Sequence, residues 1–240
     1  MPRFFVDSIS DGKYATITGE DARHISRSLR MKTGESLTVT NSGNDYSCII
    51  SSISDELIAL DIKECSRCKS EPSIDLTLYQ AVPKADKLEM IIQKSVELGA
   101  NRIVPVLTRR CVSRPSEKDF AKKLLRYQKI SLEAAKQSGR GIIPEVLPVI
   151  SYSAALERMK ADDRAFMLYE QGGSRFSEAD FGSAESVSLI IGSEGGFDES
   201  EVRQADEAGI RRIWLGDRIL RCETAPLTAI SVVMYLTGNL

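Results

Sequence analysis

The sequence predicts an α/β protein in which a mainly parallel sheet follows a small β-rich domain. Two observations support this fold class. From Leu76 onward, short apolar runs alternate with amphipathic helical patterns, which is typical of parallel strands joined by helical crossovers. Before that point, short strand patterns follow one another with turns between them. We therefore expect a β-rich domain over residues 1–70 and an α/β domain over residues 73–240, joined by a polar linker at 66–73.

The β-rich domain is predicted to contain five strands and one helix. Ser42-Gly43-Asn44 reads as a hairpin turn between two of the strands. The helix runs from Glu20 to Arg30, and its arginines share one face because they are spaced i, i+4 and i+7: Arg23, Arg27 and Arg30. This face is either an ordinary solvated surface or a contact for RNA phosphates. The predicted strands are 3–6, 14–17, 36–40, 45–53 and 57–63.

The α/β domain is predicted from alternating strand and helix patterns with recognisable ends. Asp198 is suited to cap the start of a helix and Gly209 to end it, so that helix is bounded at both sides. The predicted strands are 76–82, 102–107, 145–149, 165–169, 187–191 and 212–215. The predicted helices are 84–98, 116–137, 153–160, 199–208 and 224–236.

Length and composition exclude several classes of protein. No apolar run approaches the roughly 20 residues needed to span a bilayer, and the N-terminus lacks the apolar core of a signal peptide. The five cysteines show no framework spacing, which suits a reducing cytoplasm. Cys65 and Cys68 form one isolated pair, and with a single histidine in the chain we expect no metal site.

The net charge of −2 conceals an uneven distribution of charge. Residues 84–140 contain fourteen Lys and Arg against six Asp and Glu, whereas residues 141–240 contain nine against sixteen. Such asymmetry indicates a basic contact surface of the kind that binds nucleic acid.

The chemistry is predicted at two glycine loops between Ser188 and Pro226. One loop, Gly192–Phe197, follows the apolar run 187–191, and the other, Gly216–Arg221, follows the run 210–215. The loops are expected to leave neighbouring parallel strands at the sheet edge where ligands bind in α/β proteins. Nearby acidic residues and the lack of a GxGxxG or Walker pattern disfavour a polyphosphate. A ligand of modest charge, held mostly by backbone groups, fits better than a phosphate, although ordinary strand-to-helix turns would also explain single glycine pairs.

At these residues the chain resembles a known family. IGSEGGF at 191–197 and LGDRILRCETAP at 215–226 are similar to the RsmE family of 16S ribosomal RNA uridine N3-methyltransferases, within the SPOUT superfamily. EDARHISRSLRMKTGE at 20–35 resembles the helix and turn of the family's PUA-like domain. Ser193 and Cys222 depart from the family pattern, since proline is commoner at the first position and the second varies.

The resemblance implies a fold, a cofactor and partners. The fold would be a SPOUT-type sheet with a deep trefoil knot near the C-terminus, together with a PUA-like domain. S-adenosyl-L-methionine would be the cofactor, 16S rRNA the substrate, and a homodimer the assembly. We expect the dimer contact to involve the last helix, because four of its residues are too apolar for an exposed helix: Ile230, Val233, Met234 and Leu236. The implied cofactor-binding residues are Leu168, Ile191, Gly192, Glu194, Gly195, Gly196, Leu215, Gly216, Ile219, Leu220, Arg221, Thr224 and Ala225.

The groups that act on RNA are predicted less directly. Arg221 and Glu223 flank the second glycine loop and are the candidate catalytic pair, with Glu223 holding the guanidinium; the alternative is an ion pair that merely pins the loop. The candidate RNA-binding residues are Arg3, Arg23, Arg27, Arg30, Lys84, Arg114, Gln137 and Arg140. Two other functions remain open, namely a SPOUT enzyme that modifies another RNA position and a non-catalytic RNA-binding assembly factor.

Overall fold

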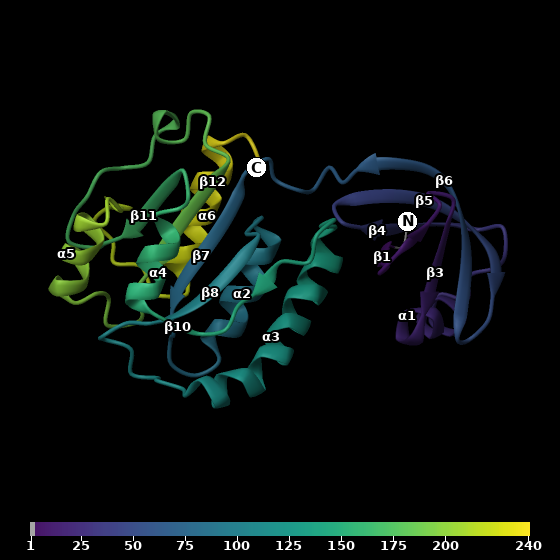
Figure 1. Ribbon diagram of the computed structural model, residues 1–240, viewed down its shortest axis with the longest axis horizontal. Helices are drawn as coiled ribbons and strands as arrows, with labels where there is room; N and C mark the ends of the chain where they lie inside the picture. Colours follow the sequence, from purple (N-terminus) through teal and green to yellow (C-terminus); the bar gives the residue numbers. More distant parts are fainter. Residues whose placement is uncertain (1–2) are drawn as a thin grey trace. The chain divides into compact units, whose positions relative to one another are not determined.

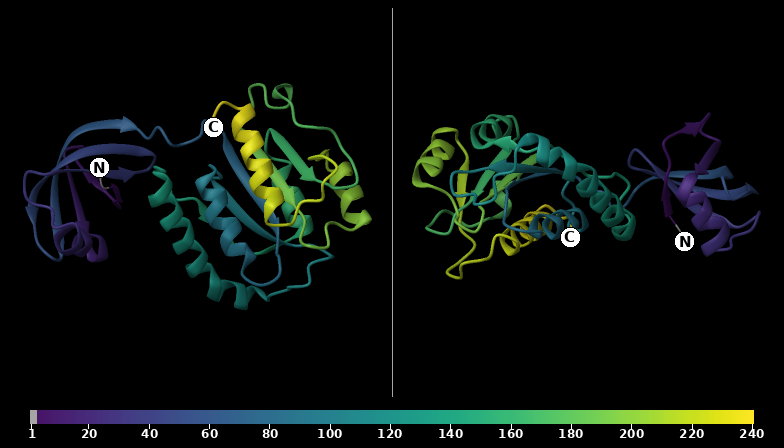
Figure 2. Two further views of the ribbon diagram at one scale, coloured as in Figure 1. Left: turned by 180° about the vertical axis from the view of Figure 1, so that it is seen from behind. Right: turned by 90° about the horizontal axis from the view of Figure 1, so that it is seen from below.

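The computed structural model describes residues 3–240 (Figures 1 and 2). The chain divides into two compact units, each with its own sheet. The first unit contains the residues up to Glu71 together with Ala135–Ile142. The second contains Pro72–Ala134 and Ile143–Leu240.

The first unit is built on a six-stranded sheet in the order β1-β4-β5-β6-β3-β2. β1 pairs with β4 in parallel, and the other pairs are antiparallel. Alternate side chains are buried, such as Leu37 and Val39, because successive residues of a strand face opposite sides of the sheet. Ser66 and Arg67 extend the last strand into the predicted linker. The strands are β1 (Arg3–Phe5), β2 (Ile9–Ser10), β3 (Tyr14–Thr18), β4 (Ser36–Asn41), β5 (Asn44–Ile53) and β6 (Leu57–Arg67).

The predicted helix over residues 20–30 differs from the structure in its second half. α1 (Gly19–Arg23) continues as a π-helical turn, η1 (His24–Ser28), in which the Leu29 N–H donates to the His24 carbonyl at 2.9 Å. A π-helical turn contains more residues than an α-helical turn. The angles between the three arginines around the helix axis therefore differ from those assumed when a shared face was predicted. All three arginines are nevertheless exposed, and Arg27 forms an ion pair with Asp55 at 2.5 Å.

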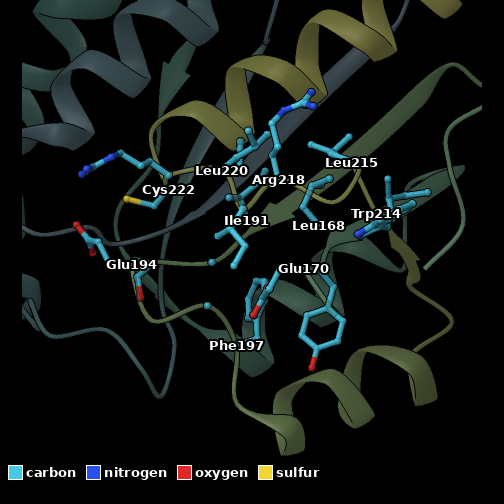
Figure 3. A pocket seen from close by; sticks show the side chains of 18 of the residues that line it. Leu168, Glu170, Ile191, Glu194, Phe197, Trp214, Leu215, Arg218, Leu220 and Cys222 are labelled. Carbon is cyan, nitrogen blue, oxygen red and sulfur yellow. The ribbon is translucent and has the colours of Figure 1, made fainter. Parts of the chain in front are cut away.

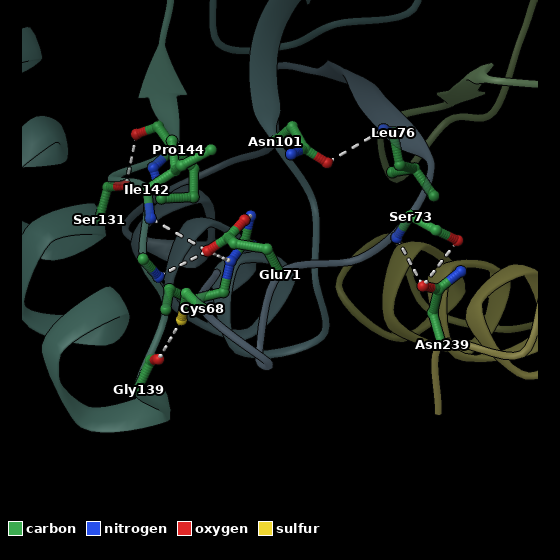
Figure 4. Close-up of polar contacts among 12 residues, drawn as sticks. Cys68, Glu71, Ser73, Leu76, Asn101, Ser131, Gly139, Ile142, Pro144 and Asn239 are labelled. Atoms are coloured by element: carbon green, nitrogen blue, oxygen red, sulfur yellow. Dashed lines mark hydrogen bonds and ion pairs between the residues drawn. The ribbon is translucent and has the colours of Figure 1, made fainter. Parts of the chain in front are cut away.

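Arg140 is buried in the first unit. Its side chain is 2% exposed, and its Nε and Nη2 donate to the Glu71 carboxylate at 3.0 and 2.9 Å. The same carboxylate accepts the Gly141 and Ile142 N–H groups; Figure 4 shows Glu71 and Ile142. Burial alone would raise the pKa of Glu71, but the hydrogen bonds and charge of Arg140, with the two backbone donors, outweigh it and lower that pKa. The predicted RNA contact of Arg140 is therefore wrong, because a buried guanidinium needs its carboxylate partner.

Arg3 is also used inside the first unit. Its Nη2 lies 2.8 Å from an Asp45 carboxylate oxygen, and its Nη1 donates to the Gly139 carbonyl. The structure thus assigns Arg3 to the packing of β1, and the RNA contact predicted for it is not supported.

The second unit confirms the predicted α/β class. Its seven-stranded sheet is parallel throughout, with the order β10-β8-β7-β12-β11-β13 and β9 paired with β8. The strands are β7 (Asp75–Ala81), β8 (Arg102–Leu107), β9 (Glu145–Val146), β10 (Ile150–Ser151), β11 (Arg164–Leu168), β12 (Ser186–Ile191) and β13 (Arg211–Ile213). The trefoil knot implied by the family resemblance stays a prediction.

Helices cover both faces of this sheet (Figure 2). α4 (Tyr152–Met159) and α5 (Glu199–Glu207) share one core with the sheet residues Tyr79 and Ile190. α2 (Lys87–Glu97) and α6 (Thr224–Leu236) lie side by side, and α6 packs on β12. The remaining helices are α3 (Glu117–Ser138), which extends into the first unit, and the short 3₁₀ turn η2 (Glu178–Asp180).

Three predictions about this unit need correction. α2 begins at Lys87 instead of Lys84, because Ala85 has a left-handed φ of 53° that a helix cannot contain. The predicted strand 145–149 is split into β9 and β10, since Pro148 has no N–H to donate to the ladder. Ile230, Val233 and Met234 are buried within the chain, so they are not evidence for a subunit contact.

Candidate functional site

Three loops meet at the carboxyl edge of the second sheet. They follow β12, β11 and β13, which are parallel neighbours in that order. The two predicted glycine loops do not leave adjacent strands, because β11 lies between β12 and β13. The loop after β11 therefore contributes a third wall, at the edge where α/β sheets bind ligands.

The loops enclose a cavity of about 500 Å³ (Figure 3). Twelve of the thirteen predicted cofactor-binding residues line it, and Thr224 does not. Ile219 lines the cavity although 82% of its surface is exposed. The lining also includes residues that sequence analysis missed, among them Lys87, Glu170, Trp214 and Arg218.

The first loop depends on a close approach of two backbone segments. A Cβ on Gly192 would lie 3.0 Å from the Cα and carbonyl carbon of Gly196. Gly196 itself has a φ of 64°, and its N–H closes a turn onto the Ser193 carbonyl at 2.9 Å. Only glycine meets the requirement at 192 without moving the loop.

The second loop offers its backbone to a ligand. Gly216 has a φ of 112°, which permits the sharp change of direction after β13. Within residues 3–240, the N–H and C=O groups from Leu215 to Leu220 form no hydrogen bond to another protein group. The loop is anchored at its two ends, where the Trp214 N–H donates to Ser174 and the Arg221 carbonyl accepts the Thr224 N–H. Unpaired backbone groups beside a cavity can bind the polar edge of a ligand.

One lysine connects the first loop with the start of α6, directly after the second loop. The Lys87 ammonium lies 3.1 Å from Glu194 Oε1 and 3.0 Å from Glu223 Oε2. The predicted pairing of Glu223 with Arg221 is therefore wrong, since the carboxylate is already neutralised by Lys87. Arg221 is exposed at the cavity, and across the described part of the chain its guanidinium has no ion-pair partner.

This network keeps its members charged at neutral pH. The hydrogen bonds that Lys87 donates to Glu223 and then to Glu194 raise the pKa of Lys87. Burial works against both carboxylates, yet hydrogen bonds from Lys87 and neighbouring donors lower the pKa of each. Burial raises the pKa of the adjacent Cys222 to about 12, so this thiol stays protonated. Glu194 thus accepts hydrogen bonds from Lys87 and from the Lys84 N–H within the protein.

Comparison with known proteins identifies the family of this chain. An RNA methyltransferase domain model matches residues 69–234, and an RNA methyltransferase PUA domain model matches residues 17–63. The chain is 34% identical to Ribosomal RNA small subunit methyltransferase E of Bacillus subtilis (strain 168), over 99% of this chain and 97% of that protein. The chain belongs to the ribosomal RNA small subunit methyltransferase E (RsmE) family.

Two solved structures extend this RsmE assignment to three dimensions. The Neisseria gonorrhoeae RsmE, solved with bound S-adenosyl methionine, has a TM-score of 0.85 and 31% identity, covering 98% of both chains. A Legionella pneumophila protein solved with the same cofactor has a TM-score of 0.81 and 29% identity, covering 97% of this chain and 96% of that one. These matches confirm the predicted family and the PUA-related N-terminal part.

Glu170 is the main pocket residue that sequence analysis of this RsmE chain missed. It is exposed and follows β11, and the loop continues into Gly172 and Gly173. A Cβ on Gly173 would lie 2.7 Å from the Arg212 carbonyl oxygen. This glycine pair after a predicted strand was a readable signal of the same kind as the glycines of the other two loops.

The remaining predicted RNA-binding residues are exposed but divided between the units. Arg23, Arg27, Arg30 and Gln137 belong to the first unit, and Lys84 and Arg114 to the second. The Arg114 guanidinium donates to the Thr108 carbonyl at 2.8 Å. In the described residues there is no cluster of three or more metal-ligating side chains, and none of the helices between residues 3 and 240 is long and apolar enough to cross a membrane.

Proposed function

We propose that this protein methylates N3 of a uridine in 16S rRNA of the small ribosomal subunit, with S-adenosyl-L-methionine as cofactor, in the cytoplasm. The observation that carries the proposal is the cavity formed by three glycine-containing loops in a chain of the RsmE family. The cofactor in the Neisseria gonorrhoeae relative supports the same ligand here.

The residues of the cavity fit this cofactor. A volume of about 500 Å³ lies within the roughly 300–1,000 Å³ of small-molecule sites. Ile191, Leu215 and Leu220 offer apolar walls for a purine, and the unpaired backbone groups of 215–220 offer partners for its polar edge. The exposed Glu170 carboxylate is suited to accept hydrogen bonds from ribose hydroxyls. The cofactor supplies an electrophilic methyl group, while the protein supplies binding, orientation and electrostatics.

Arg221 is our candidate for the group that acts on the base. Uracil N3 is a weakly acidic imide, and it becomes nucleophilic when its proton is lost. A nearby cation favours the deprotonated base. Arg221 lines the cavity, and its guanidinium has no carboxylate partner among the described residues, which leaves its charge available to substrate. Glu223 supports the loop through Lys87 and is not proposed to orient Arg221.

Recognition of RNA is proposed for the exposed arginines of the first unit. In the described chain Arg23 and Arg30 form no ion pair, whereas Arg27 is paired with Asp55. Arginine without an internal partner is suited to bind phosphate oxygens.

The first prediction separates cofactor binding from RNA binding. Gly192→Ala should weaken S-adenosyl-L-methionine binding at least about tenfold in calorimetry, because the new Cβ displaces the first loop, and should leave RNA affinity unchanged. The double variant Arg23→Ala with Arg30→Ala should show the reverse pattern. Gly182→Ala is the control for backbone strain in general, because Gly182 is a loop glycine with a φ of 48° that lies outside the cavity. Full cofactor affinity in Gly192→Ala would place the binding site elsewhere.

The second prediction concerns Arg221. Arg221→Ala should slow single-turnover methyl transfer at saturating cofactor by at least about tenfold, while cofactor affinity changes by about twofold or less. Raising the pH from about 7 to about 9 should restore part of the rate, because the N3 proton is then lost without help. Arg218→Ala is the matched control, since Arg218 is another exposed arginine lining the cavity. If wild type and Arg221→Ala respond to pH in parallel, Arg221 only positions the substrate.

We also propose a homodimer. Its support is an exposed apolar pair on adjacent helices, Met90 on α2 and Tyr235 on α6, at 42% and 70% exposure. Light scattering should therefore give about twice the chain mass of 26.5 kDa, and Tyr235→Glu should give the monomer mass. A monomeric wild-type protein with full methyl-transfer activity would contradict this proposal.

A further inference from the structure

The two loops that bear the cofactor-facing backbone are joined by a single side chain from another element. Lys87, the first residue of α2, contacts Glu194 in the loop after β12 and Glu223 at the start of α6. We propose that Lys87 is a positioning residue that holds these two loops at the separation S-adenosyl-L-methionine requires. The inference rests on the proposed function and adds a residue that neither glycine loop contains.

The contacts around Lys87 converge on the same two carboxylates. The Lys84 N–H donates to Glu194 Oε1 at 3.1 Å, and the Cys222 thiol donates to Glu223 Oε2 at 3.2 Å. The side chains of Lys87, Glu194 and Glu223 are 29%, 27% and 16% exposed. They are therefore better shielded from solvent than a typical surface pair, which contributes little. Because each carboxylate has a second donor, its orientation toward the ammonium is constrained.

Apart from the cation–π contact of Arg175 with the Trp214 ring at 5.3 Å, few polar contacts hold the second loop in place. Its backbone from Leu215 to Leu220 forms no internal hydrogen bond within the described chain. Lys87–Glu223 is also the one ion pair made by any of the residues 214–223 to the part of the protein that the structure describes. Loss of this ammonium should therefore free the loop between its anchored ends and leave the carboxylates of Glu194 and Glu223 repelling each other.

Lys94 provides a matched control on the same helix. Its ammonium pairs with Glu97, one turn further along α2, at 2.8 Å, and it does not line the cavity. Lys94→Met thus removes a lysine and one ion pair from α2 without touching either loop. Lys87→Arg keeps the positive charge and replaces the ammonium by a guanidinium. A guanidinium can still bridge two carboxylates.

The test compares hydrogen exchange in the cofactor-free protein with calorimetric S-adenosyl-L-methionine binding. Lys87→Met should accelerate exchange of the hydrogen-bonded amides of both loops, which are Gly196 in the first loop and Trp214 and Thr224 at the two ends of the second. It should also weaken binding about tenfold, equivalent to about 1.4 kcal/mol. Lys87→Arg should recover part of both effects, and Lys94→Met should match wild type. The variants Lys87→Met and Glu223→Gln should be non-additive in a double-mutant cycle, because they remove the same contact.

Several outcomes would overturn the proposal. These are unchanged exchange and affinity in Lys87→Met, acceleration confined to one loop, or additive effects in the cycle. If Lys87→Met does not fold, Glu223→Gln carries the test, with the same faster exchange and weaker binding expected. Failure of the wild-type protein to bind the cofactor would instead contradict the proposed function, so the two failures are distinguishable.

Discussion

The close approach of Gly192 to Gly196 is the constraint on which the cofactor pocket depends. A Cβ at Gly192 would lie 3.0 Å from the Gly196 backbone and would force the loop to shift, and Glu194 and Gly195 of this turn line the cavity. The turn is held by β12, which is hydrogen-bonded to β7 on one side and β11 on the other. A central strand is among the most rigid places in a fold, so the loop that follows it has a fixed starting point. The loops after β11 and β13 then complete the walls of the cavity.

Ion pairing decides which arginines can act on a substrate. Arg140 and Arg3 looked available in the sequence, yet each is bound to a carboxylate within the first unit. Arg221 looked paired in the sequence, yet Lys87 takes its expected partner. A guanidinium that lies within the fold needs a carboxylate to offset its lost hydration, whereas one at a cavity can keep its charge for a ligand. Among the described residues, Arg218 and Arg221 both line the cavity without an ion-pair partner, and Arg221 is our candidate for the reaction.

Much of the fold and pocket could be predicted because the signals were local. The apolar run before Gly192 predicted β12, and Asp198 with Gly209 predicted the limits of α5. Asp198 indeed accepts the Ser200 N–H at 3.0 Å. The predictions that were wrong depended on contacts between residues far apart in the sequence. No local pattern shows that β11 lies between the two glycine loops, or that Lys87 pairs with Glu223. The π-helical turn at His24 has no signature in the arginine spacing.

The proposed reaction transfers a methyl group from the cofactor in this pocket to uridine N3 of the small-subunit RNA. The most direct test starts with small ribosomal subunits from a strain that lacks this protein. These subunits are incubated with the purified protein and isotope-labelled S-adenosyl-L-methionine. Mass spectrometry of the digested RNA should then show 3-methyluridine at a single position. N3 lies on the pairing edge of the base, so the modified uridine has to be unpaired when it reacts. A label on ribose or on carbon 5, or no transfer to RNA at all, would contradict methylation of uridine N3 by this protein.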